Sequence, residues 1–74
     1  MSEKSQLLFV QTRLIRLATN EWNMPMQAVL EIFKRYNVFK YIDVGFGIFH
    51  CEGDYAVLED IESYLDRKGY KFNA

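Results

Sequence analysis

The chain has 74 residues, of which 50% are hydrophobic and 16% aromatic, and its formal net charge is −1. A chain of this length forms one domain, residues 1–74, with a thin core that buries roughly 60% of the unfolded surface. The near-neutral charge disfavours nucleic acid as the main partner, the single cysteine excludes an internal disulfide, and no apolar run near the start suits a signal peptide or membrane span. We therefore expect a cytoplasmic protein.

The first predicted helix covers about residues 3–19. Arg13 and Arg16 fall on its polar side, opposite an apolar stripe at helical spacing. The apolar positions are Leu7, Leu8, Val10, Leu14, Ile15, Leu17 and Ala18. Thr19-Asn20 is the expected end of this helix.

The second predicted helix covers about residues 25–36. Pro25 suits its first position because the ring fixes φ at a helical value. The apolar stripe consists of Met26, Val29, Leu30, Phe33 and Tyr36. Asn37 is expected to end the helix in a left-handed conformation. Trp22 and Met24, in the preceding connection, should fill the gap between the two helices.

Residues 38–44 are predicted to form a third helix, but residues 46–57 are ambiguous. Gly45 and Gly47 oppose a longer helix, since each costs about 1 kcal/mol relative to alanine. Read at a period of two, the segment resembles a strand, a turn at Glu52-Gly53-Asp54 and a returning strand. An irregular helix and a hairpin both remain open here.

The last predicted helix covers about residues 57–68. Leu58, Ile61 and Leu65 form its apolar stripe, and Gly69 is the expected terminator. We therefore predict a mainly α fold, a small bundle of three to four helices. The alternative is an α+β fold with a short hairpin near residues 46–57.

His50 and Cys51 are the residues with the most evident potential for chemistry. As neighbours they point in different directions in a helix or a strand. A zinc site needs about four ligands, and the sequence has no second His or Cys. A nucleophilic pair would require the two side chains to converge. We therefore predict no catalytic residues, no metal site, no cofactor and no small-molecule substrate, and we expect a protein that is not an enzyme.

Acidic residues are concentrated in one part of the chain. Seven of the ten lie between Tyr41 and Asp66, where there is no Lys or Arg. A solvated helix face explains this pattern most simply. The functional interpretation is an acidic surface for a basic protein partner, anchored by exposed aromatic side chains. The predicted partner-binding residues are Tyr41, Phe46, Phe49, His50, Asp54, Tyr55, Glu59 and Asp60.

Two further interpretations concern the basic and aromatic residues. Lys34, Arg35 and Lys40 lie among aromatic residues, a pattern that can bind single-stranded nucleic acid. Three cations are few, so a nucleic-acid-binding regulator of its own operon is the alternative function. The excess of aromatic residues over a small core also leads us to expect a homodimer.

One stretch resembles a known family. The resemblance is carried by Phe33-Lys-Arg-Tyr36-Asn-Val38, Tyr41-Ile42, Ile48-Phe-His50, Gly53, Asp60-Ile61 and Tyr64-Leu65. These motifs resemble a family of short bacterial proteins of unknown function, with departures at Phe49-His50-Cys51, where the family has Leu-His-Thr, and at Gly45 and Gly47.

Members of that family are often encoded beside a protein that resembles an ADP-ribosyltransferase toxin. The resemblance therefore implies an antitoxin-like or accessory role, with the product of a neighbouring gene as the protein partner. It implies no catalytic residues. Together, these observations predict a non-enzymatic protein–protein interaction module.

Overall fold

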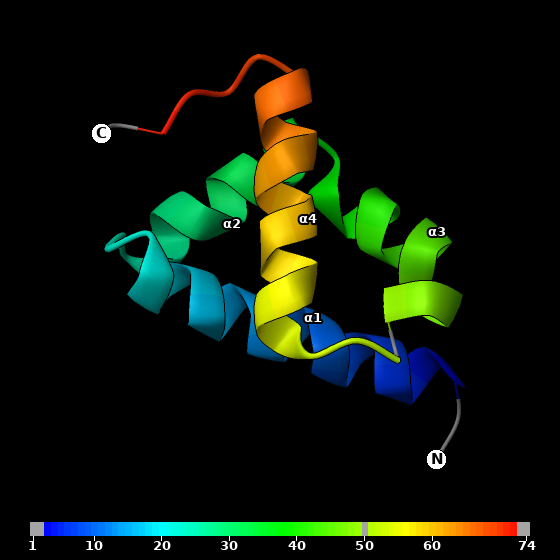
Figure 1. The fold of residues 1–74 in the computed structure, drawn as a ribbon. Coiled ribbons are helices and arrows are strands. Elements are labelled where there is room, and N and C mark those ends of the chain that lie inside the picture. Colours follow the sequence, from blue (N-terminus) through cyan, green and yellow to red (C-terminus); the bar gives the residue numbers. More distant parts are fainter. Residues whose placement is uncertain (1–2, 50, 73–74) are drawn as a thin grey trace.

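The computed structural model describes residues 3–49 and 51–72, and the side chains of all of these except Glu3 and Phe49. Four helices follow one another in this part of the chain: α1 (Glu3–Glu21), α2 (Met26–Arg35), α3 (Val38–Phe49) and α4 (Asp54–Arg67). Helix α1 packs against the other three, and α2 packs against α3. In Figure 1, α4 crosses in front of α1, with α2 and α3 on its two sides. The predicted mainly α bundle is confirmed.

The core lies where the apolar stripes of the four helices meet. Its buried side chains are Val10, Leu14, Ala18, Val29, Phe33, Val38, Ile42, Phe46, Val57, Leu58, Ile61 and Leu65. Two members of the predicted stripes lie at the surface instead: Leu8 is 64% exposed and Met26 is 50% exposed. Every buried side chain in the described ranges is apolar. No helix in these ranges combines the length and apolar composition needed to cross a membrane.

Helix α3 corrects the prediction for the middle of the chain. It runs without interruption from Val38 to Phe49, through both glycines, so neither an end at residue 44 nor a hairpin over residues 46–57 is right. The two glycines cost about 2 kcal/mol together. Burial of Val38, Ile42 and Phe46 on one face returns roughly 1.5–3 kcal/mol for each side chain. Tertiary packing therefore outweighs the low helix propensity of glycine.

Helix α4 begins at Asp54, three residues before the predicted start. Gly53 precedes it in an extended conformation, and its carbonyl oxygen accepts a hydrogen bond from the Val57 N–H at 3.1 Å. A carboxylate in the first turn is favourable, since it faces the positive end of the helix dipole. The turn that was predicted at residues 52–54 therefore leads directly into a helix.

Residues with positive φ end three of the helices. Asn37 (φ 57°) follows α2 and Gly69 (φ 97°) follows α4, as predicted. At Gly69 the hydrogen bonds are those of a Schellman motif: the Gly69 N–H donates to Asp66 O and the Tyr70 N–H to Leu65 O. Asn23 (φ 53°) follows α1, which therefore extends to Glu21, beyond the expected end at Thr19-Asn20.

The predicted start of α2 also needs a small correction. Helix α2 begins at Met26, because Pro25 has an extended ψ of 154°. The Pro25 carbonyl oxygen accepts hydrogen bonds from the N–H groups of Ala28 and Val29. Pro25 is therefore the N-cap residue of α2 and not its first helical residue.

Aromatic rings form a continuous chain through one end of the bundle. Each ring contacts the next, with centroid distances between 4.8 and 6.1 Å. In order, the rings are Tyr36, Tyr70, Phe72, Trp22, Phe33 and Phe39. Two of them belong to residues 68–72, which we call the C-terminal strap and which folds back from the end of α4 (Figure 1). The strap thereby ties α4 to α2 and to the connection after α1.

Candidate protein-binding face

Four of the predicted partner-binding residues lie on the first two turns of α4, but only two share its outer side. Tyr55 and Glu59 are four residues apart, which places them on one helix face. Tyr55 is 61% exposed, and Glu59 is also exposed. Ser63 and Asp66 continue this face with helical spacing and are exposed as well. We call these four residues the α4 outer face.

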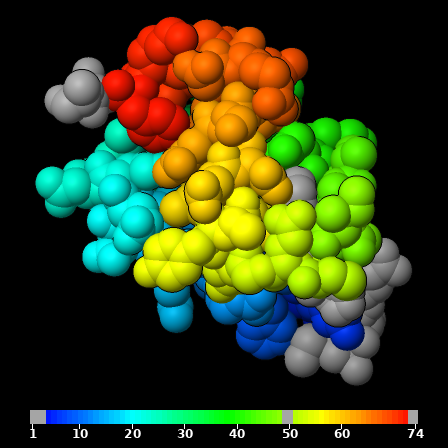
Figure 2. Space-filling view, in the orientation of Figure 1, coloured from blue at the N-terminus to red at the C-terminus, as the bar shows by residue number. Residues whose placement is uncertain are grey.

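Figure 2 shows the side chains of α4 running down the middle of one side of the molecule. A shallow cavity of about 490 Å³ lies beside the C-terminal half of the α4 outer face. The cavity is lined by Glu59, Glu62, Ser63, Asp66, Arg67 and Phe72. Glu62, Ser63 and Asp66 were not among the predicted contact residues, although their helical spacing from Tyr55 and Glu59 identifies them once α4 is known to begin at Asp54.

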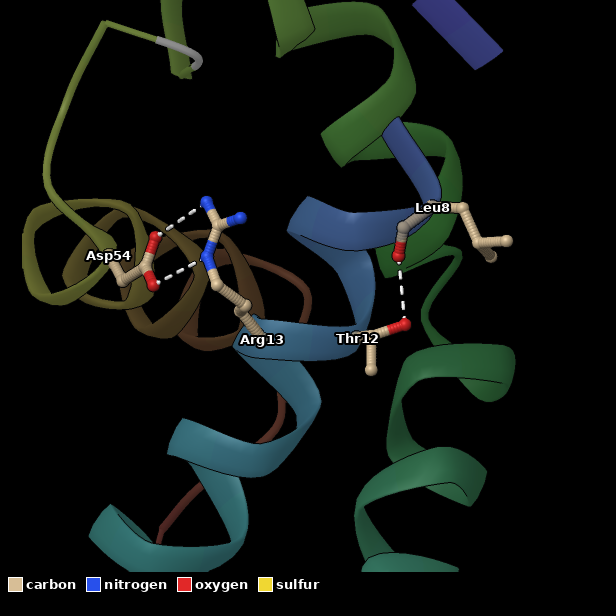
Figure 3. A network of polar contacts seen from close by, with 4 residues as sticks. All are labelled: Leu8, Thr12, Arg13 and Asp54. Atoms are coloured by element: carbon tan, nitrogen blue, oxygen red, sulfur yellow. Dashed lines mark hydrogen bonds and ion pairs between the residues drawn. The ribbon is translucent and has the colours of Figure 1, made fainter. Parts of the chain in front are cut away.

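Asp54 turns inward from this face and binds Arg13 of α1 (Figure 3). Arg13 donates two hydrogen bonds, from Nε to Oδ2 at 3.0 Å and from Nη2 to Oδ1 at 3.3 Å. This two-point contact raises the pKa of Arg13. Asp54 therefore clamps the start of α4 to α1. On the same turn of α1, the Thr12 hydroxyl donates to the Leu8 carbonyl oxygen at 2.8 Å.

Asp60 lies on the other flank of α4, next to Glu52 from the preceding loop. The pKa of Glu52 is raised, first by loss of hydration and then by the charge of Asp60 and a hydrogen bond to it. Glu59 takes part in neither of the two ion pairs of the described residues. The start of α4 therefore presents acidic groups that the described part of the chain does not neutralise.

Further along α4, Asp66 has a cationic partner. Lys71 of the C-terminal strap donates a hydrogen bond from Nζ to Asp66 Oδ1 at 2.8 Å. This contact lowers the pKa of Asp66, first through the hydrogen bond and then through the charge of Lys71. Uncompensated negative charge is thus concentrated near Tyr55 and not near the end of the helix.

The predicted aromatic contacts on α3 need correction. Phe46 is only 8% exposed and belongs to the core, so the expectation that its ring is at the surface is wrong. Tyr41 is half-buried and stacks on Tyr64, with ring centroids 4.2 Å apart. The side chain of Phe49 and all of His50 lie outside the described residues. Tyr55 is thus the candidate aromatic residue that the structure places at the surface.

The basic residues of the alternative function lie elsewhere. Lys34 and Arg35 are exposed in the last turn of α2, and Lys40 is exposed on α3. Lys34 and Arg35 line an open cavity of about 650 Å³ together with Tyr36 and Tyr70. Glu31 lines the same cavity, so its charge is mixed.

The described residues offer no arrangement typical of a metal site. No three His, Cys, Asp or Glu side chains among residues 3–49 and 51–72 are grouped so that they could hold a metal ion. Cys51 is an exposed free thiol, 4.0 Å from the carbonyl oxygen of Gly47. The chemically distinctive feature of this surface is therefore the exposed Tyr55 among acids.

Comparison with known proteins finds one family. The sequence profile of the family described as "protein of unknown function (DUF3791)" matches residues 9–68. This range contains α2, α3 and α4 completely and most of α1. It agrees with the resemblance to a family of unknown function. No curated protein and no solved structure matches the chain.

Proposed function

This chain belongs to the DUF3791 family, and we propose that it is a non-enzymatic protein–protein interaction module that binds its partner through the α4 outer face. One observation carries the proposal: Tyr55 is 61% exposed at the start of α4, one turn before Glu59, an exposed acid that takes part in neither ion pair of the described residues. A tyrosine in this position can anchor an interface, because its rigid ring supplies contact area and its hydroxyl a hydrogen bond.

The surrounding charges define the chemistry of the partner. Glu59 lies one turn after Tyr55, and Glu52 and Asp60 lie close together on the flank. A complementary surface would present lysines or arginines around an apolar pocket for the tyrosine ring. The acids would mainly accelerate the encounter, and the ring would mainly slow dissociation.

The family resemblance supplies a candidate partner. Proteins with these motifs are often encoded beside a protein that resembles an ADP-ribosyltransferase toxin. We therefore propose that this chain is the antitoxin-like component of a bacterial toxin–antitoxin pair. In this proposal it acts in the cytoplasm and inhibits the neighbouring gene product by covering a basic functional surface.

Co-expression with the product of the neighbouring gene tests this function. The wild-type chain should co-purify with that protein and form a complex at micromolar concentration. Tyr55→Ala and Glu59→Lys should each weaken the complex by about tenfold or more, since hot-spot residues contribute on this scale. Met26→Ala is the matched control, because Met26 is a 50% exposed apolar residue on α2, and its loss should leave binding unchanged.

Absence of a complex at micromolar concentration, with both proteins folded, would contradict the antitoxin role. If a complex formed but neither substitution on α4 weakened it, the assignment of the α4 outer face would be wrong. Circular dichroism of each variant shows whether the bundle is intact.

A further inference from the structure

The C-terminal strap lies against the end of the α4 outer face and brings a cation and an aromatic ring to it. Figure 2 shows the strap, in red, beside the end of α4, in orange. Lys71 donates a hydrogen bond from Nζ to Asp66 Oδ1 at 2.8 Å, and Asp66 is the last residue of the α4 outer face. Phe72 lines the shallow cavity beside that face together with Glu59, Ser63 and Asp66. Two strap side chains thus already occupy the C-terminal half of the proposed binding surface.

The charges around this cavity favour a cation that comes from outside α4. Glu59, Glu62 and Asp66 all line the cavity, whereas the cation that α4 itself contributes to the lining is Arg67. Glu59 takes part in neither ion pair of the described residues. Lys71 therefore supplies positive charge to a surface with an excess of acid. A lysine or arginine of another protein would meet the same carboxylates.

The strap is held less firmly than the helices. None of its five residues is buried: Tyr70 and Phe72 are half-buried, and the others are exposed. The ion pair of Lys71 is exposed on both sides, so it contributes little to holding the strap closed. Open cavities flank the strap, one lined by Tyr70 with residues of α2 and another by Phe72 with Trp22. A segment with few buried contacts opens at a lower free energy than the core.

We propose that the C-terminal strap is an intramolecular competitor for the α4 outer face, and that a basic protein partner displaces it. This inference rests on the proposed function, because it concerns the regulation of the same surface. In the closed state, Lys71 holds Asp66 and Phe72 fills part of the cavity. Opening the strap leaves Asp66 free for a cation of the partner and enlarges the cavity beside Glu59. Tyr55 is accessible in both states, so contact with the partner can begin there.

Native-state hydrogen exchange of the full 74-residue chain tests whether the strap opens without the partner. The Tyr70 N–H donates to the Leu65 carbonyl oxygen, so this amide is protected only while the strap folds back. Relative to its unprotected rate, it should exchange at least about tenfold faster than the amide of Ile61, in the buried middle of α4. Low concentrations of urea should leave its exchange unchanged. A Tyr70 amide that exchanges only through global unfolding would overturn the proposal.

Lys71→Ala tests the competition, with the product of the neighbouring gene as the probe. The variant lacks the ion pair with Asp66 and should lower the dissociation constant about two- to fivefold, the range expected for an exposed ion pair. Lys40→Ala is the control for charge, because it removes an exposed lysine of α3, outside the strap. It should change the constant by less than about twofold.

Tyr70→Ala/Phe72→Ala separates opening of the strap from loss of positive charge. The substitutions remove the rings that contact Tyr36 and Trp22 but leave the net charge unchanged. Because the partner no longer has to open a closed strap, the dissociation constant should fall about tenfold or more. Circular dichroism shows whether the bundle is intact, and Lys71→Ala, which keeps both rings, supplies the test if the double variant loses its helical spectrum.

Equal affinity of the wild type and both strap variants would overturn the competition and leave the proposed function standing. Weaker binding by the strap variants would also overturn it, since the strap would then be part of the partner's binding site. Binding by the strap variants alone, without binding by the wild type, would support it. Absence of binding by all three proteins would reject the proposed function, and the competition with it, whatever the hydrogen exchange shows.

Discussion

Two carboxyl groups meet where the loop after α3 joins α4. Glu52 and Asp60 interact, and the resulting rise in the pKa of Glu52 marks a place where negative charge is held without compensation. By contrast, Asp54 is committed to Arg13 and Asp66 to Lys71. The acids of this region therefore differ in role, although their sequence clustering makes them look alike. The acids without cationic partners are the ones that a basic partner would contact.

Replacing Asp60 tests this arrangement. Asp60→Asn should lower the pKa of Glu52 towards its ordinary value of 4.5, because the charge of Asp60 and its acceptance of a hydrogen bond both favour protonated Glu52. Because the pKa of Glu52 is higher in the folded protein than in the unfolded chain, the free energy of unfolding of the wild type falls as the pH rises from 4.5 through the raised pKa. The variant should lose less stability over this pH range. Carboxyl NMR titration and urea melts at several pH values measure both effects. An unchanged pKa would mean that lost hydration alone causes the shift.

Trp22 allows a second test at the level of a single residue. Its Nε1 donates a hydrogen bond to Glu62 Oε2 at 2.8 Å in a partly buried position. Trp22→Phe keeps an aromatic ring but removes this donor, so the free energy of unfolding should fall by about 1–2 kcal/mol. Urea unfolding followed by circular dichroism measures the change. Equal stability would show that solvent competes successfully for Glu62.

The helices could largely be predicted from the spacing of apolar residues, but their ends and the middle of the chain could not. The stripes of α1, α2 and α4 identified most of the core, and Asn37 and Gly69 were recognised as left-handed ends. The predicted third helix ended too early, at residue 44, because Gly45 and Gly47 have low helix propensity. The burial of Phe46 that overrides them depends on the other helices and cannot be read from local sequence.

The candidate site was predictable only in part for the same reason. Tyr55 and Glu59 were identified correctly as surface residues, because the acids around them indicate a solvated helix face. Tyr41 and Phe46 were predicted to be exposed but are half-buried and buried, respectively. Local sequence does not decide whether such an aromatic residue packs into the core or faces solvent. Tyr41 turns towards α4 because Tyr64 offers a ring to stack on.

Gly47 allows the cost of a glycine inside α3 to be measured without disturbing the core. Gly47→Ala should raise the free energy of unfolding of the monomer by about 1 kcal/mol, because alanine is the better helix former and the added methyl group meets open space. Thermal unfolding followed by circular dichroism measures this effect. A loss of stability would show that the helix surface at Gly47 is not free in the monomer.

At the scale of the whole molecule, the aromatic residues have a structural purpose. Six rings form a chain that joins the C-terminal strap, the connection after α1, α2 and α3. A 74-residue domain has little core, and large rings compensate for this by burying much area per residue. Most of the aromatic residues that suggested a binding surface therefore pack inside the bundle. Among the described side chains, the exposed aromatic residues are Tyr55, at 61%, and Phe9, at 55%.

The contribution of the strap can be measured separately. Tyr70→Ala/Phe72→Ala should lower the free energy of unfolding by about 2 kcal/mol, since it removes two half-buried rings from the chain. The fluorescence of Trp22 should shift to longer wavelength in the folded variant, because Phe72 no longer covers the indole. Lys71→Ala, at the position between Tyr70 and Phe72, is the control. The exposed Lys71 side chain contacts only Asp66 among the interactions described, so the free energy of unfolding and the Trp22 fluorescence should both stay nearly unchanged. A variant as stable as the wild type would show that the strap is dispensable.

Binding of a protein partner at the α4 outer face can be measured by calorimetric titration of the folded chain with the product of the neighbouring gene. We expect saturable binding with a dissociation constant in the micromolar range or below, weakened about tenfold or more by Tyr55→Ala and unaffected by Met26→Ala. Binding that is equally strong in the wild type and in Tyr55→Ala, or no binding at all, would contradict the claim.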